Sequence, residues 1–199
     1  LIIGTEDILN HSIDLNCDLG EGSTILDCDR DARLMPHLSS CNIACGGHAG
    51  NDQVMIESIK NAVIYDLSIG AHPGYPDKEN FGRITLNLPV EELVASIDEQ
   101  LNRFLDHINS LNAKCSHIKF HGALYNDLEH QPDLREALTK LLTEKYSSVK
   151  IFGLAGGKFE QACSNQTINF IPEGFIDRTY QSNGQLTPRK QKGSLISNP

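Results

Sequence analysis

Three histidines of this sequence each follow a short apolar run, at a point where a strand of an α/β fold would end. They are His48 in Ala-Cys-Gly-Gly-His-Ala-Gly, His72 in Ile-Gly-Ala-His-Pro-Gly-Tyr and His121 in Ile-Lys-Phe-His-Gly-Ala-Leu-Tyr. Imidazole can exchange a proton near neutral pH and can also bind a metal ion. The carboxyl ends of parallel strands are where α/β folds assemble catalytic pockets. The spacing therefore predicts an acid–base pocket.

A fourth strand exit carries carboxylates and an amide. The run Ile-Asp-Leu-Asn-Cys-Asp-Leu-Gly-Glu supplies Asp14, Asn16, Asp18 and Glu21. Residues two apart in a strand point to the same face, so we expect 14, 16 and 18 to face the inside of the sheet or its mouth. A buried carboxylate needs a cation, a donor or a proton. We interpret these residues as part of a functional site, the alternative being a hydrogen-bonded network that closes the barrel.

Lys119 lies two residues before His121 inside a predicted strand. A lysine there is expected to pair with one of the carboxylates. It would act either as a structural ion pair or as a cation for a substrate carboxylate or an oxyanion. His48 has two interpretations of equal weight, a site residue approached closely by glycines or a cap for the helix that begins near Asn51. His72 precedes Pro73, which restricts it to an extended backbone and fixes its direction.

A set of Asp18, His72 and His121 could bind a divalent metal ion, because carboxylate and imidazole are common ligands. The three residues come from separate predicted strands, so no local spacing rule tests the set. The remaining histidines fall on predicted loops, helices or opposite strand faces and are expected to be incidental; they are His11, His37, His107, His117 and His130.

Short apolar runs alternate with amphipathic ones along the chain. The apolar runs predict strands over 12–17, 41–45, 67–71, 116–120, 149–153 and 168–172. Their consecutive apolar positions are typical of strands covered on both faces. The amphipathic runs predict helices over 52–65, 89–111, 132–146 and, more briefly, 156–165.

Such alternation indicates parallel strands joined by crossover helices. A barrel and an open doubly wound sheet both fit, and the barrel is favoured because polar residues follow nearly every strand. Residues 72–88 and 173–199 are expected to be loops over the strand ends, with an extended tail from about residue 180. The chain of 199 residues is expected to form one domain.

Composition excludes several classes of protein. Lys and Arg number 17 against 26 Asp and Glu, giving a formal net charge of −9, which disfavours a nucleic-acid surface. No apolar run approaches the roughly 20 residues that span a bilayer, and no secretory signal is visible. The six cysteines lack the spacing of a zinc site and are expected to be reduced thiols of a cytoplasmic protein.

Several segments together resemble the LamB/YcsF family. The matching motifs run in order along the chain: Asp14-Leu-Asn-Cys-Asp-Leu-Gly-Glu-Gly22, Asn42-Ile-Ala-Cys-Gly-Gly-His-Ala-Gly50, Gly70-Ala-His-Pro-Gly-Tyr-Pro-Asp77, Phe81-Gly-Arg83, His121-Gly-Ala-Leu-Tyr-Asn126, Phe152-Gly-Leu-Ala155 and Phe175-Ile-Asp-Arg178. The resemblance implies a distorted, incomplete (β/α) barrel similar to that of polysaccharide deacetylases, a seven-stranded relative of the TIM barrel. Its last strand–helix unit is expected to be missing from this chain.

The resemblance also implies an activity, the ATP-dependent opening of the lactam of 5-oxoproline to glutamate, performed with two partner subunits. It implies ATP with Mg as cofactor, and a divalent metal in the pocket is a further option. The expected catalytic residues are Asp14, Asn16, Asp18, Glu21, His48, His72, Lys119 and His121. The expected substrate-binding residues are Tyr75, Arg83, Tyr125, Asn126 and Arg178.

The sequence departs from the family pattern at Gly47, Gly74 and Phe120, where an aromatic residue, Ser and Pro are common. These positions are expected to line the pocket, so the shape of the substrate could differ. Two other functions stay open: a metal-dependent deacetylase or amidohydrolase, by analogy of fold, and a non-catalytic binding subunit of a carboxylase or hydrolase complex.

Overall fold

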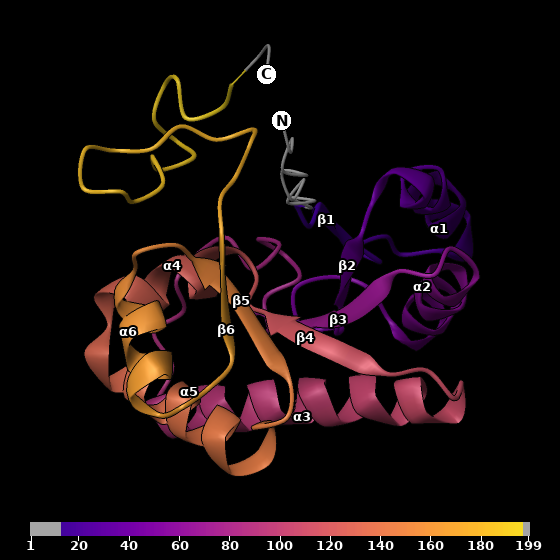
Figure 1. Ribbon diagram of the computed structural model, residues 1–199, viewed down its shortest axis with the longest axis horizontal. Helices are drawn as coiled ribbons and strands as arrows, with labels where there is room; N and C mark the ends of the chain where they lie inside the picture. The colour runs from indigo at the N-terminus through magenta and orange to yellow at the C-terminus, as the bar shows by residue number, and fades with distance from the viewer. Residues whose placement is uncertain (1–12, 197–199) are drawn as a thin grey trace, which may run out of the picture.

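A computed structural model describes residues 13–196 of the chain. Helices and strands alternate along it (Figure 1). In chain order the elements are β1 (Asn16–Leu19), α1 (Ile25–Ala32), the 3₁₀ turn η1 (Met35–His37), β2 (Ser40–Ala44), α2 (Asp52–Ile64), β3 (Ser68–His72), α3 (Val90–Ser110), β4 (Cys115–Lys119), α4 (Gly122–His130), α5 (Pro132–Lys145), β5 (Lys150–Leu154), α6 (Lys158–Asn165) and β6 (Phe170–Glu173).

The six strands form one parallel sheet in the order β1-β2-β3-β4-β5-β6, so each strand pairs with its neighbours in sequence. This is the order of a (β/α) barrel. Among the described residues β1 and β6 are the outer strands and do not pair with each other, so the barrel is incomplete. The predicted fold class is thereby confirmed, with six strands present.

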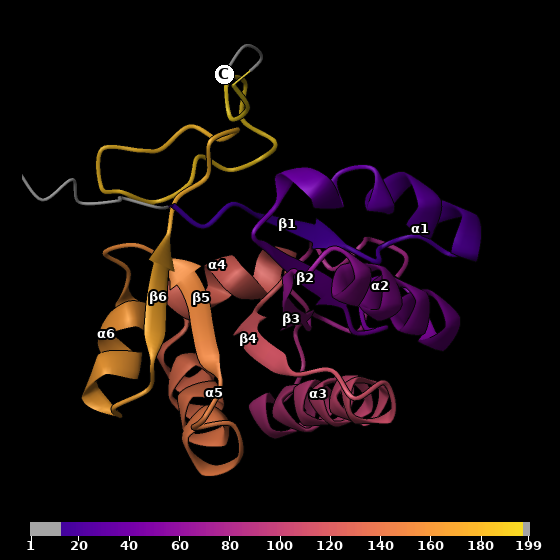
Figure 2. The ribbon, with the colours of Figure 1, turned by 45° about the vertical axis from the view of Figure 1, so that its right-hand side comes forward.

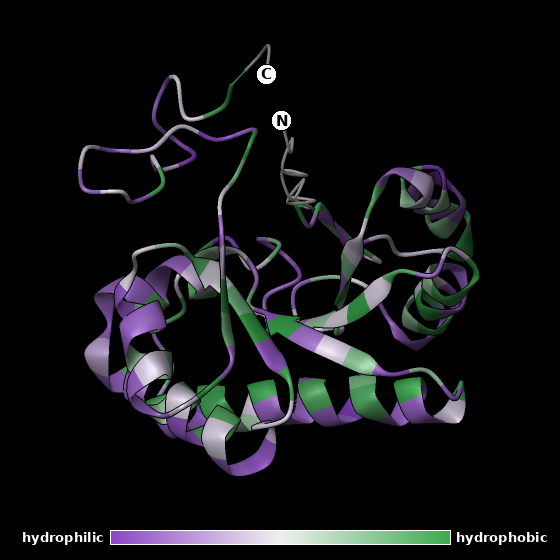
Figure 3. Ribbon diagram, in the orientation of Figure 1, coloured by the Kyte–Doolittle hydropathy of each residue, from purple (hydrophilic) through white to green (hydrophobic). Residues whose placement is uncertain are grey.

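Helices cover the outside of the sheet, as Figure 2 shows. Asn51 precedes the helix α2, and its side chain accepts a hydrogen bond from the Val54 amide at 3.1 Å and so caps the first turn. The long helix α3 has an apolar side, and apolar and polar residues alternate along it in Figure 3. Its buried apolar residues recur with helical spacing at Leu93, Ile97, Leu101, Phe104 and Ile108.

The core lies on both sides of the sheet. All five residues of β2 are buried, and so are the last four of β3 and of β5. Strands covered on both faces must carry apolar residues at consecutive positions, which is why these runs were readable in the sequence. None of the helices among residues 13–196 combines the length and the apolarity that crossing a membrane would need.

Five of the six predicted strands and all four predicted helices agree with the structure to within about two residues at each end. The first strand begins at Asn16, whereas we predicted residue 12, which lies outside the described residues. Two helices, α1 and α4, were not predicted. The loop at 73–89 and the segment after β6 are confirmed as irregular, the latter carrying two isolated antiparallel bridges and lying beyond the carboxyl ends of β5 and β6 (Figure 1).

Candidate active site at the carboxyl ends of the strands

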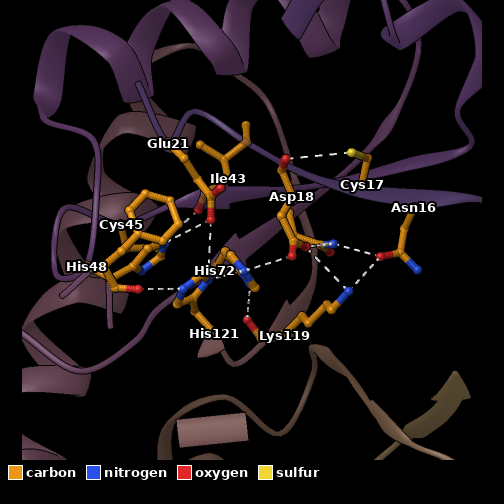
Figure 4. Close-up of polar contacts among 12 residues, drawn as sticks. Asn16, Cys17, Asp18, Glu21, Ile43, Cys45, His48, His72, Lys119 and His121 are labelled. Carbon is orange, nitrogen blue, oxygen red and sulfur yellow. Dashed lines mark hydrogen bonds and ion pairs between the residues drawn. The ribbon is translucent and has the colours of Figure 1, made fainter. Parts of the chain in front are cut away.

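Three histidines and two carboxylates meet where the first four strands end. Glu21 follows β1, His48 follows β2, His72 is the last residue of β3, and His121 follows β4. Asp18 lies on β1 itself. Figure 4 shows His72 between two groups, with Glu21 and His48 on one side and Asp18 on the other. The predicted convergence of strand exits is thus present in the structure.

Loops with unusual backbone conformations bring these residues together. Gly46 and Gly50 on either side of His48 have φ of 84° and 73°, a region that glycine enters without strain. Phe81 also has a positive φ, 56°, although it carries a side chain. A non-glycine residue in this conformation is strained and is often found at functional sites. The Phe81 ring makes edge contacts with both His48 and His121.

The histidine rings are held in fixed orientations. His72 Nδ1 lies 2.7 Å from the Lys119 carbonyl oxygen, and His121 Nε2 lies 3.0 Å from the Phe81 carbonyl oxygen. The rings of His48 and His121 stack in parallel, with centroids 3.6 Å apart. His48 caps no helix, since Asn51 performs that role for α2. The capping interpretation of His48 is therefore wrong, and the site interpretation stays a prediction.

A chain of close polar contacts links the histidines to Glu21 and Asp18. One oxygen of Glu21, Oε1, lies 3.2 Å from His48 Nε2 and 3.3 Å from His121 Nδ1. His121 Nδ1 in turn lies 3.0 Å from His72 Nε2, which lies 3.3 Å from Asp18 Oδ2. The three histidines are buried, whereas the side chains of Glu21 and Asp18 remain 25% and 35% exposed. The carboxylates therefore connect the buried rings to solvent.

Lys119 forms the other half of the site. Its ammonium lies 3.4 Å from Asp18 Oδ1 and 3.2 Å from Glu173 Oε2, and it donates to Asn16 Oδ1 at 3.0 Å. It also lies 5.1 Å from the centre of the Phe175 ring. Lys119 thus pairs with carboxylates as expected. These contacts occupy the ammonium, so it is not a free cation for a substrate carboxylate.

A second hydrogen-bond network lies below Asp18, toward the interior. The Asn42 side-chain amide donates to Asn16 Oδ1 at 2.7 Å and to Asp18 Oδ1 at 2.8 Å. Asn42 Oδ1 accepts from His117 Nε2 at 2.7 Å, and the His117 ring stacks on Phe152. We expected His117 to be incidental, but it is buried and points to the same face of β4 as Lys119.

The environment of the site lowers the pKa values of both its carboxyl groups and two of its imidazole groups. Burial alone would raise the pKa of Asp18, but His72 and Lys119 outweigh it and hold that pKa well below its usual value. Burial likewise opposes ionisation of Glu21, yet the His121 and His48 rings beside its carboxylate lower its pKa to about 2. Burial lowers the pKa of His48 to about 4 and also lowers that of His121. At neutral pH both carboxylates are therefore charged, and His48 and His121 are uncharged.

Several predicted site residues lie elsewhere. Asp14 is exposed and accepts a hydrogen bond from Ser40 at the start of β2, so it lies at the opposite end of the strands from the pocket. The Tyr75 hydroxyl is buried and donates to Asp127 at 2.8 Å. Asn126 is exposed on α4 and donates to the Gly122 carbonyl oxygen. Asp14 was included in the site because it alternates with Asn16 and Asp18, but this alternation could not show that the strand begins only at Asn16.

The two predicted arginines also lie outside the central cluster. Arg178 donates to the carbonyl oxygens of Ser194 and Thr187 and so holds the segment after β6 in shape. Arg83 is exposed, with its guanidinium over the Phe81 ring at 4.8 Å. It lies next to the residue that contacts His48 and His121. Arg83 is therefore the predicted cation best placed at the rim of the pocket.

Tyr125 lies against Phe175, and its buried hydroxyl is close to Glu173. Burial and that carboxylate raise the pKa of Tyr125 well above its usual value, so it keeps its proton. This residue therefore borders the Lys119 half of the site.

Three contributing residues were not predicted: Glu173, Asn42 and Gln100. Glu173 ends β6, so the rule that selected the histidines would have selected it too. Asn42 is a polar residue inside an otherwise apolar strand, a signal that was present in the sequence. Gln100 is buried on α3, and its amide accepts from the Gly74 N–H at 3.1 Å and donates to the Gly74 carbonyl at 2.9 Å. It thereby fixes the loop that follows His72.

Among the described residues, Glu21, His48, His72 and His121 each offer one ligand atom within 4.8 Å of the others, a group compatible with a divalent metal ion. We predicted a metal set of Asp18, His72 and His121. The group in the structure keeps both of these histidines but contains Glu21 and His48 in place of Asp18.

A polyphosphate fits this end of the sheet less well than a metal ion does. The amides of Lys158 and Phe159 at the start of α6 already donate to Glu129, and two carboxylates pair with the ammonium of Lys119.

Comparison with known proteins places these features in context. A sequence model of the LamB/YcsF family matches residues 13–199. The A subunit of 5-oxoprolinase from Bacillus cereus (strain AH187) is 38% identical over 188 residues, covering 94% of this chain and 74% of that protein. The protein of the same name from Bacillus anthracis (strain CDC 684 / NRRL 3495) is 37% identical over the same shares.

A solved structure is also similar. The lactam utilization protein from Thermus thermophilus superposes with a TM-score of 0.87 at 30% identity, covering 94% of this chain and 76% of that one. The family match includes all six strands and every residue of the pocket described above.

Proposed function

The chain belongs to the LamB/YcsF family, and from that membership we propose that it is one component of a 5-oxoprolinase, which hydrolyses the lactam of 5-oxoproline to glutamate. The observation that carries the proposal is the match over 94% of this chain to proteins named as the A subunit of 5-oxoprolinase. The pocket at the strand ends supports it, because its residues suit the hydrolysis of an amide.

Opening a lactam breaks the ring C–N bond. The oxygen of water joins the carbonyl carbon and both of its protons end on the ring nitrogen, so the product carries a new carboxylate and an ammonium group. The pocket presents charged Asp18 and Glu21 beside uncharged His121 at neutral pH. All three accept hydrogen bonds, so a water among them would donate its hydrogens to the protein and turn an oxygen lone pair toward the substrate.

A carboxylate with a pKa of about 2 is a weak base, so Glu21 is better suited to holding the histidines and water than to removing a proton at neutral pH. His48 fixes Glu21 through the 3.2 Å contact. Arg83 at the rim and Tyr125 beside Glu173 are the groups we propose for binding the lactam.

We propose that the active enzyme also contains partner subunits and uses ATP with Mg, as the resemblance implies. The residues of this pocket do not fit a triphosphate, since the buried lysine is already paired and the local charge is negative. ATP is therefore assigned to the assembled complex and to no residue here. A cytoplasmic location fits the six free cysteines of the chain.

The test is a glutamate-release assay with the chain in complex with its partner subunits, ATP and 5-oxoproline. We expect Asp18→Asn and His121→Ala each to lower turnover about 100-fold or more. Lys140→Met changes an exposed side chain of α5 and serves as the matched control, with unchanged turnover. Near-normal turnover in both site variants would overturn the assignment of this pocket. The proposed function would be overturned if the rate of ATP hydrolysis did not depend on 5-oxoproline in any combination of subunits.

A further inference from the structure

The tautomer of His72 follows from its contacts. The Lys119 carbonyl oxygen, 2.7 Å from His72 Nδ1, can only accept a hydrogen bond, so Nδ1 carries the proton. In the neutral ring the other nitrogen, Nε2, is then a bare lone pair. His72 is buried, and this lone pair points into the cluster at the strand ends.

His121 is fixed in the complementary way. The Phe81 carbonyl oxygen, 3.0 Å from His121 Nε2, takes the proton of that nitrogen and leaves Nδ1 as the lone pair. His121 Nδ1 lies 3.0 Å from His72 Nε2 and 3.3 Å from Glu21 Oε1. Three electron-pair donors thus face one another, and each ring has its only hydrogen directed away from the others. Such a group is repulsive until a cation lies between its members.

The arrangement of charged side chains in the pocket also favours a bound cation. Asp18, Glu21 and Glu173 contribute three negative charges around the single positive charge of Lys119. Lys119 pairs with Asp18 and Glu173, whereas the ion-pair contacts of Glu21 among the described residues are with histidine rings. The Glu21 carboxylate therefore has no lysine or arginine beside it, and a divalent cation would supply the missing positive charge.

The distances match those of a coordination shell. Ligand bonds of about 2.1 Å place neighbouring donors about 3.0 Å apart in an octahedron and about 3.4 Å apart in a tetrahedron. The observed donor separations are 3.0 Å and 3.3 Å. Carbonyl oxygens that accept the other ring N–H are the usual outer partners of metal-bound histidine.

His48 is better placed beside the ion than on it. Its ring is parallel to that of His121, 3.6 Å away, and an imidazole lone pair lies in the plane of its ring. Two parallel rings cannot both aim a lone pair at one ion between them. His48 Nε2 instead lies 3.2 Å from Glu21 Oε1, where its N–H can donate and hold the carboxylate in place.

We propose that Glu21, His72 and His121 bind one divalent transition-metal ion of the kind that imidazole favours, with His48 as a positioning residue. This two-histidine, one-carboxylate set leaves coordination positions open on the side where Asp18 and Glu21 are exposed. The inference deepens the proposed function at the same site. A metal ion there would supply a water with a lowered pKa at neutral pH, which an unactivated amide requires.

The test is calorimetric titration of the full chain with Zn²⁺, after chelator treatment and without partner subunits, ATP or lactam. We expect one Zn²⁺ per chain and a rise in Tm on binding. Co²⁺ in place of Zn²⁺ should give the visible absorption of a protein-bound ion, and Mg²⁺ should bind far more weakly because it prefers oxygen ligands.

Variants connect the ion to these residues. His72→Gln and His121→Gln should each weaken Zn²⁺ binding at least 100-fold, whereas His48→Gln should weaken it about 10-fold, as changes to outer partners do. His37→Ala removes an exposed histidine and should leave the affinity unchanged. Equal affinity in His72→Gln, His121→Gln and the parent chain, or no stoichiometric binding by the parent chain, would overturn the inference. Metal binding without lactam hydrolysis would overturn only the proposed function, and lactam hydrolysis without metal binding would overturn only this inference.

Discussion

Lys119 is a buried ammonium whose charge depends on its neighbours. Only 6% of its side chain is exposed, and burial alone would lower its pKa. Asp18 and Glu173 reverse that effect and raise the pKa instead. The same contact stabilises both carboxylates, so neither charge can be removed without leaving the other uncompensated.

Replacing Lys119 by Met therefore should destabilise the fold by about 3 kcal/mol, the lower end of the range for breaking a buried ion pair, because Asp18 is a third exposed. The measurement is urea denaturation at neutral pH. Lys140→Met is the control, since Lys140 is exposed and lies 3.9 Å from Glu144, and it should change the free energy of unfolding by less than about 0.5 kcal/mol. Equal effects of the two substitutions would contradict this account.

The central site residues could be predicted from the sequence because each follows an apolar run. That rule located His48, His72 and His121, and the alternation of β1 located Asn16 and Asp18. The same rule could not predict the direction of side chains that lie on loops after the strand ends. Tyr75 and Arg178 lie close to the correct segments, but their side chains turn to Asp127 and to backbone carbonyls of the last loop. Only the three-dimensional course of a loop determines such directions.

At the scale of elements, the strands and the long helices were readable because they are buried on characteristic faces. The helix α1 has only eight residues and buries only Cys28, so its apolar face is too short to be recognised in the sequence. The helix α4 has nine residues and begins at Gly122, whose φ is 58°. Neither helix has the sequence features by which helices are usually recognised. Packing against the rest of the molecule stabilises both of them.

Gly70 on β3 pairs with His117 on β4 inside the sheet. A Cβ at Gly70 would lie 2.1 Å from His117 Nε2, so the ring occupies the space that any side chain there would need. Gly70→Ala is expected to destabilise the protein by about 1–3 kcal/mol through overpacking. Thermal denaturation of Gly70→Ala, His117→Ala and the double variant measures the coupling. The double variant should be at least about 1 kcal/mol more stable than the sum of the single effects predicts. Simple additivity would rule out the steric explanation.

Asp52, the first residue of α2, links that helix to α3. Its Oδ2 accepts from Arg103 Nη2 at 2.7 Å and its Oδ1 lies 3.0 Å from His107 Nε2. Hydrogen bonds from Arg103 and then His107 lower the pKa of Asp52 to about 2, from an ordinary value of 3.8. Because the folded-state pKa is depressed, this stabilisation is complete above about pH 4 and is lost as the pH falls toward 2.

The stability difference between the parent chain and Asp52→Asn should therefore shrink between pH 4 and pH 2. It should be less than about 1 kcal/mol at pH 7, because the Asp52 side chain is 45% exposed and solvent screens the pair. Denaturation curves at a series of pH values measure it. Asp133→Asn, an acidic residue in the first turn of α5 that takes part in no ion pair among the described residues, is the control. A difference that stays constant down to pH 2 would contradict the assignment.

At the scale of the molecule, side chains connect the two outer strands that the backbone leaves apart. The Asn16 amide on β1 donates to Glu173 on β6 at 3.2 Å. Lys119 on β4 contacts both residues and Asp18 as well. The incomplete barrel is therefore closed across its interior by a polar bridge rather than by strand pairing.

Asn16→Ala removes the direct contact between these strands. We expect amide hydrogen exchange in β1 and β6 to become about tenfold faster, since one or two hydrogen bonds of about 1 kcal/mol each are lost. The amides of β3 should exchange at their original rate. Asn126→Ala removes an exposed side chain that donates to the Gly122 carbonyl within α4; it is the control and should leave the strands unchanged. Equal acceleration in every strand would show global destabilisation instead.

The bridge has a mechanical consequence. A sheet that does not close on itself can change its curvature, and here the curvature is set by the distance from β1 to β6. The residues that span this distance also hold Asp18, so bending the sheet and moving the carboxylate are one motion. The segment after β6 begins at this bridge, because Glu173 pairs with Lys119 and the Phe175 ring lies 5.1 Å from the same ammonium. The course of that segment and the position of Asp18 are therefore coupled through one lysine.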